Sequence, residues 1–202
     1  MDEEGYFYRS SEEAQAHLDP AAAVSEIEAQ IQRAIAAGID ISHIDTHMGS
    51  VFHPALLAGY IQNALKYRVP AMILRQDRQR LEKTARDMGA PLPMIELYVQ
   101  QMESLETQGF PMLDHIIGMP LEEHENRLQR AVELVESLPA GITHFLVHPS
   151  KDTPELRAIT PDWRARVADY QLFMDERWRA HVASCGIHVI GYKHLRELMR
   201  GS

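Results

Sequence analysis

The stretch GIDISHIDTHMGSVFHP, residues 38–54, places His43, Asp45 and His47 on alternate positions and adds His53 six residues later. Alternate side chains of a strand share one face, and each residue advances the chain by about 3.3 Å, so a straight strand would hold His43 and His47 about 13 Å apart. That separation is too large for one ion bound at about 2 Å from each ligand. We therefore expect His47, at the strand mouth, to be the metal ligand, with Asp45 one step deeper in a supporting or proton-handling role and the other ligands on neighbouring strands.

Composition excludes several classes of protein. The 202 residues carry a formal net charge of −9, which argues against nucleic acid or an anionic membrane as a partner. No apolar run approaches the 18 residues of a membrane span, and the N-terminus has no signal-peptide pattern. The one cysteine, Cys185, excludes an internal disulfide framework and fits a reducing cytoplasm. We expect a cytoplasmic protein, and the excess of histidines (11 in all) suggests metal or proton chemistry.

Helical and strand-like segments alternate along the chain. Asp19 and Pro20 are a favourable N-cap and first residue for the first long helix, which Gly38 ends. Strands are expected at residues 39–45, 69–75, 110–118, 141–149 and 187–192, and helices at 20–37, 54–68, 78–89, 120–138, 160–186 and 193–200. This order predicts a single α/β domain over residues 1–202, with parallel strands joined by crossover helices. Residues 90–110 fit the alternation less well and are expected to be a cap insertion.

Polar side chains gather where these strands end. Arg75 ends the second strand and His148 ends the fourth, while Asp114 and His115 lie inside the third. Ligands of parallel α/β proteins bind at the carboxyl ends of the strands. Together with residues 43–47, these ends predict a functional site. Arg75 has a structural alternative, because an arginine at a strand end also pairs with helix carboxylates.

The stretch SHIDTHMGSVFHP resembles the hallmark THxDSHxHxHxxP of the YdjC-like carbohydrate deacetylases. FLVHPS resembles the His-Pro element of that family, AMILR resembles its strand ending in arginine, and the tail from ELRAITPDW onward resembles its closing segment. The resemblance runs over residues 5–198. It implies an irregular (β/α) barrel that removes acetyl groups from N-acetylated sugars.

The resemblance also implies roles for particular residues. In the family an aspartate and two histidines hold a divalent ion, Zn²⁺ or Mg²⁺, which polarises the acetamide carbonyl and lowers the pKa of a bound water. His47 matches the second histidine ligand. His148 matches the histidine of the His-Pro element, a candidate acid or substrate contact, and Asp45 has a supporting or proton-handling role. Arg75 matches an arginine that holds the sugar or a carboxylate. His53 has no counterpart in the pattern.

The sequence also departs from the family. An opening Asn-Ala-Asp-Asp-Phe-Gly strand and a second strand with a ligand histidine are not found in it, and later histidines of the hallmark are changed at Met48, Gly49 and Val51. We therefore expect a shortened chain, an incomplete TIM-like barrel of about five strands with two open edges, and weak metal binding or none. The alternatives are a non-catalytic binding or self-associating module, which forms a homo-oligomer through those edges, and, less favoured, another barrel hydrolase or isomerase with a His/Asp metal site.

Overall fold

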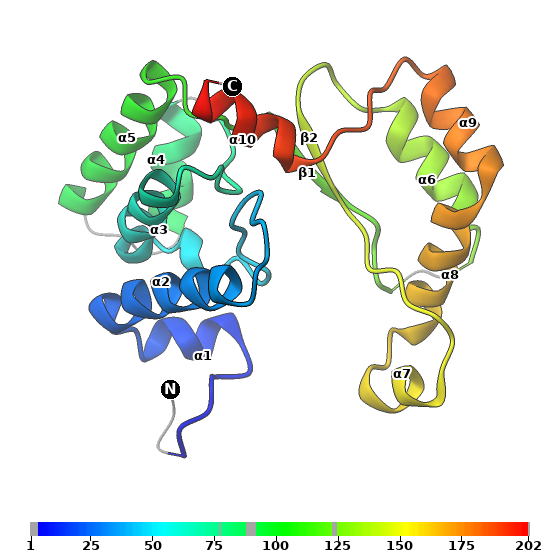
Figure 1. Ribbon diagram of the computed structural model, residues 1–202, viewed down its shortest axis with the longest axis horizontal. Coiled ribbons are helices and arrows are strands. Elements are labelled where there is room, and N and C mark those ends of the chain that lie inside the picture. The colour runs from blue at the N-terminus through cyan, green and yellow to red at the C-terminus, as the bar shows by residue number, and fades with distance from the viewer. Residues whose placement is uncertain (1–3, 77, 88–91, 123–124, 202) are drawn as a thin grey trace. The chain divides into compact units, whose positions relative to one another are not determined.

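A computed structural model describes residues 4–76, 78–87, 92–122 and 125–201 (Figure 1). Contacts divide the chain into two compact units. Unit 1 comprises residues 1–112 and 191–202, and unit 2 comprises residues 113–190. Each unit is described by itself, and the expected single domain stays a prediction.

Unit 1 is built almost entirely from helices. The first long one begins where the sequence predicts, because the Asp19 carboxylate accepts hydrogen bonds from the main-chain N–H groups of Ala21 and Ala22 at 3.0 and 3.1 Å. The elements of the unit are α1 (Ser11–Ala16), α2 (Pro20–Ala36), η1 (Ser50–Phe52), α3 (Pro54–Tyr67), α4 (Arg78–Asp87), α5 (Leu92–Thr107) and α10 (Tyr192–Arg200). The helices predicted at 20–37, 54–68, 78–89 and 193–200 are confirmed within the described residues.

Helices α3 and α5 supply most of the core of unit 1. Tyr60 and Ala64 of α3 pack with Val99 and Met102 of α5, and all four are buried. Helix α5 therefore takes part in the core, although it lies within the segment expected to be a cap. Helix α2 approaches α3 so closely that a Cβ on Gly59 would lie 2.1 Å from Val24 Cγ2, so only glycine fits there.

The two strand-like runs of unit 1 touch at one point. Ile44 and Ala71 form an isolated parallel bridge, with hydrogen bonds from Ile44 N–H to Pro70 O at 2.9 Å and from Met72 N–H to Ile44 O at 3.0 Å. The Tyr60 hydroxyl, buried to 1% exposure, donates to Ile44 O at 2.7 Å and accepts from Met72 N–H at 3.2 Å. One side chain of α3 thus fixes both extended segments.

Unit 2 holds a parallel sheet of two strands, β1 (His115–Gly118) and β2 (Thr143–Leu146), in the register His115 to Thr143. Its helices are α6 (Arg127–Glu136), α7 (Pro154–Ile159), α8 (Trp163–Met174) and α9 (Glu176–Ser184). Figure 1 shows the chain running from β1 through α6 to β2. The core joins Met119, Ala131, Leu172 and Trp178. The predicted parallel strand pairing is confirmed here, with strands shorter than the expected 110–118 and 141–149.

The expectation of about five strands is wrong for the part of the chain that the structure describes. Residues 39–45 and 69–75 form isolated bridges rather than strands and pair with each other at Ile44 and Ala71, and residues 187–192 form no strand. An apolar run becomes a strand only when a neighbouring backbone pairs with its N–H and C=O groups. At 187–192 Ile187 packs on the core of unit 2, while Val189 and Ile190 stay exposed.

Two predicted helices are also corrected. The helix expected from residue 120 begins only at Arg127, because the left-handed backbone of Asn126, with a φ of 52°, cannot continue a right-handed helix. The helix expected over 160–186 is broken at Asp175, whose extended backbone ends α8 and whose carboxylate caps α9 by accepting from Arg177 N–H at 2.8 Å. No described helix is long and apolar enough to cross a membrane.

Replacing Tyr60 by Phe is expected to lower the free energy of unfolding by about 1 kcal/mol, because the ring remains and only a buried hydroxyl that serves two main-chain groups is lost. Urea denaturation measures the change. Tyr67→Phe is the matched control, since its hydroxyl bonds side chains on a partly exposed surface. Equal losses in the two variants would contradict the role given to Tyr60.

Candidate functional site

His43 and Asp45 lie at the C-terminal end of the first extended segment. His43 Nε2 is 3.9 Å from Asp45 Oδ2, and both side chains are partly exposed. The His43 ring stacks on Tyr192, with ring centroids 3.9 Å apart and planes 4° apart. Its Nδ1 lies 3.0 Å from the hydroxyl of Ser42. Tyr192 therefore supports the imidazole from α10, a position that sequence spacing could not reveal because the two rings are separated by most of the chain.

The negative charge of Asp45 affects the pKa values of two tyrosines, Tyr60 and Tyr192. Burial raises the pKa of Tyr60, and the Asp45 carboxylate raises it further. The same two causes, burial first, raise the pKa of Tyr192. Both phenols therefore stay neutral across the physiological range and present rings and hydroxyls to the surroundings of Asp45.

His47 lies two residues beyond Asp45, on a turn. The chain reverses at Gly49, whose φ is 75°, and Gly49 N–H bonds Thr46 O at 3.0 Å. Thr46 is buried and accepts from Val51 N–H at 3.3 Å, whereas His47 is exposed. Residues 39–45 form no strand here, so the prediction that His47 lies at a strand mouth stays a prediction. His53 has a structural task, since its Nδ1 accepts from Ala55 N–H at 3.2 Å at the start of α3.

The described residues do not fit a metal ion by themselves. Among them no three His, Cys, Asp or Glu side chains are grouped closely enough to hold one. His47 and Asp45 thus supply at most part of a ligand set. The metal role of His47 stays a prediction.

Arg75 pairs with a helix. Its Nε lies 3.2 Å from Glu106 Oε1 of α5, and both side chains are about half exposed. This contact is the structural alternative considered for an arginine at a strand end. A half-exposed pair of this kind contributes about 0–1 kcal/mol, and the substrate-binding role of Arg75 stays a prediction.

His148 follows β2 in unit 2, whereas the other predicted residues belong to unit 1. Its main-chain N–H donates to Asp169 Oδ2 at 3.0 Å, and Asp169 Oδ1 accepts from Arg127 Nε at 2.7 Å. The ring atom Nδ1 is buried and has no hydrogen-bond partner among the described atoms. Sequence reasoning missed both Asp169 and Arg127, because each reads as an ordinary helical charge.

Asp114, inside the third predicted strand, has a local task. Its Oδ2 accepts from Ile142 N–H at 2.8 Å. A Cβ on Gly141, whose φ is 131°, would lie 2.7 Å from the same oxygen. His115 Nε2 lies 3.3 Å from Ala140 O. Both residues therefore hold the turn before β2.

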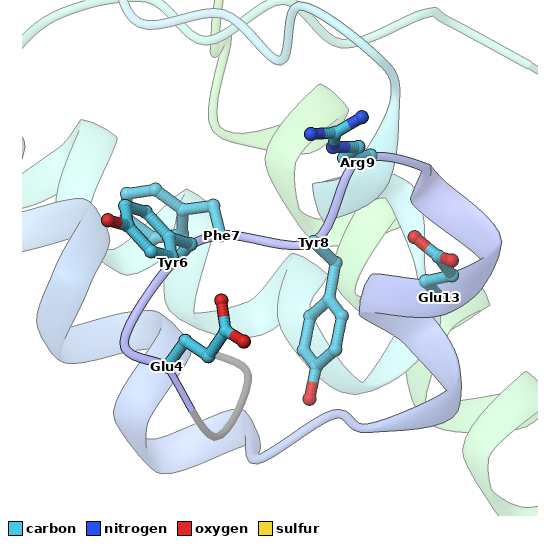
Figure 2. Close-up of a pocket in the computed structure, with 6 residues that line it drawn as sticks. All are labelled: Glu4, Tyr6, Phe7, Tyr8, Arg9 and Glu13. Atoms are coloured by element: carbon cyan, nitrogen blue, oxygen red, sulfur yellow. The ribbon is translucent and has the colours of Figure 1, made fainter.

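A hollow of about 710 Å³ lies along the N-terminal arm, where Tyr6, Phe7 and Tyr8 stand beside Arg9 (Figure 2). Glu4 and Glu13 complete its lining. The arm is tied to the loop after His47, because the Ser11 hydroxyl donates to Met48 O at 3.0 Å. All its walls come from one short stretch of chain, so we assign it no role.

Replacing Tyr192 by Leu is expected to weaken unit 1, because the stacked ring is lost from His43. A double-mutant cycle with His43→Leu should give a coupling of about 0.5–1.5 kcal/mol, read from urea denaturation. Tyr192→Phe keeps the ring and should retain most of that coupling. Additive losses in the cycle would show that the two rings do not support each other.

Known proteins are similar to this chain over most of its length. The family model described as YdjC-like protein matches residues 1–184. A carbohydrate deacetylase of Thermus thermophilus is 31% identical over 98% of this chain and 69% of its own length. A carbohydrate deacetylase of Thermoanaerobacter pseudethanolicus is 22% identical over 97% of this chain and 69% of its own length.

A solved structure shares the fold. It is a protein of Enterococcus faecalis V583, provisionally described as a cellobiose-phosphate cleavage protein, with a TM-score of 0.67 and 17% identity. The match covers 96% of this chain and 68% of that one. The family match spans most of the chain, and the Thermus relative is aligned over nearly all of it. The chain belongs to the YdjC-like family.

Proposed function

We propose that this protein is a carbohydrate deacetylase that hydrolyses the acetamide bond of N-acetylated amino sugars or oligosaccharides. The observation that carries the proposal is the stretch from His43 to His47 at the end of an extended segment, in a chain whose relatives are named carbohydrate deacetylases. An incomplete barrel and a cytoplasmic location remain part of the proposal.

The proposed chemistry divides the work among the predicted residues. Asp45, partly exposed beside His43, accepts a proton from the attacking water. His148, which follows β2, donates a proton to the departing amine. Arg75 releases Glu106 to bind the sugar. His47 would supply one donor to a Zn²⁺ or Mg²⁺ ion, whose ligand set the described residues do not complete.

The decisive experiment measures metal content and acetate release together. The purified chain is loaded with Zn²⁺, freed of excess ion and analysed by elemental mass spectrometry, and acetate is then assayed with N-acetylglucosamine oligomers. Where the genome encodes in-frame residues ahead of Met1, that longer form is tested in parallel. An active form should hold about one ion, and His47→Ala should lower both metal content and activity by at least about 10-fold. His188→Ala, an exposed histidine of unit 2, is the matched control.

The outcomes separate the possibilities. Metal without acetate release from any acetylated sugar would overturn deacetylation. Unchanged metal content in His47→Ala would overturn the ligand role of His47. Neither metal nor activity in any form would favour a non-catalytic module.

The self-associating alternative rests on the sheet of unit 2. In the described part of the chain β1 and β2 have only each other as strand neighbours. Strand edges of this kind pair with other chains. Light scattering over a range of concentrations would reveal a dimer formed in this way.

A further inference from the structure

A buried ion pair lies behind the strand ends of unit 2. Asp169 on α8 is 0% exposed, and Arg127 at the start of α6 is 6% exposed. The Arg127 Nε donates to Asp169 Oδ1 at 2.7 Å. Both partners are thus withdrawn from water.

The pair is connected to the exits of both strands. On the β2 side, Asp169 Oδ2 accepts from the main-chain N–H of His148 at 3.0 Å. On the β1 side, Arg127 Nη1 donates to the main-chain oxygen of Pro120. The carboxyl ends of parallel strands lie at one edge of a sheet, so one ion pair holds the backbone at the edge from which His148 departs.

Stability alone does not account for such a pair. Removing two charges from water costs about as much as their attraction returns, and a well-packed apolar pair is often as stable. What an apolar pair cannot supply is a carboxylate oxygen aimed at the N–H of His148. What the ion pair provides, and an apolar pair does not, is therefore a fixed position for the main chain of His148.

We propose that Asp169, held in place by Arg127, is a positioning residue for His148. The carboxylate fixes the main chain at His148. The imidazole then acts from a fixed point of attachment. The inference rests on the proposed function, which makes His148 the proton donor to the leaving amine.

The test separates positioning from folding. Asp169→Asn keeps the shape of the side chain and loses its charge, which leaves Arg127 buried without its counter-charge. The double variant Arg127→Met/Asp169→Leu replaces the ion pair by apolar side chains and is expected to recover most of the stability. Glu133→Gln, which removes an exposed pair with Arg130 on α6, is the control. Stability is measured by urea denaturation for all three.

Two further readouts report on His148 itself. Exchange of the His148 amide with deuterium, followed by NMR, should be at least about 10-fold faster in the double variant, because a hydrogen bond to a charged acceptor is gone. In the form that releases acetate, kcat should fall at least about 10-fold while KM changes less than about two-fold, because a fixed proton donor acts in the transition state rather than in substrate binding. Glu133→Gln should change none of these values.

Amide exchange decides the proposal even if no form releases acetate. A double variant as stable as the wild type, with wild-type exchange at His148, would overturn the positioning role. Faster exchange without acetate release from the wild-type chain would leave the positioning role in place and would count against the proposed function alone.

Discussion

The hydroxyl of Tyr60 is the constraint on which the candidate site of unit 1 depends. The two extended segments of this unit share a single bridge, between Ile44 and Ala71, which is too little pairing to hold a strand by itself. Tyr60 adds hydrogen bonds to both segments from the rigid core of α3. Because Asp45 directly follows Ile44, that buried contact fixes the main chain from which the Asp45 side chain extends. The packing of α3 therefore fixes the main chain next to a polar side chain.

In unit 2 a buried ion pair, rather than a tyrosine hydroxyl, fixes the main chain. There the extended segments pair as a true parallel ladder, and the point that needs fixing is the exit of the chain at His148. The Arg127–Asp169 pair supplies a hydrogen-bond donor at one strand exit and an acceptor at the other. In both units a buried polar side chain from a helix holds the backbone just before a candidate functional residue. A polar group buried in this way is satisfied only in one geometry, which explains why it specifies position better than an apolar contact does.

The sequence predicted the helices of unit 1 well, because caps such as Asp19 and Pro20 are local signals. It predicted strands poorly. An apolar run such as residues 187–192 carries the composition of a strand, but whether it pairs depends on a neighbour that the run itself does not encode. The late start of α6 was also missed, because nothing in the sequence around Asn126 marks its left-handed backbone. Candidate residues at strand ends were predictable, whereas their partners Tyr192 and Asp169 were not, since each is distant in sequence and ordinary in type.

The neighbours of the stretch from His43 to His47 explain how its residues are held. Its alternate residues differ in what holds them. His43 stacks on Tyr192 and lies 3.9 Å from Asp45, Asp45 follows the bridge at Ile44, and His47 is exposed on a turn. Among the described residues no third ligand is grouped with Asp45 and His47. The roles proposed for the stretch, support by His43, proton handling by Asp45 and ligand capture by His47, therefore require partners outside the motif to bind a metal.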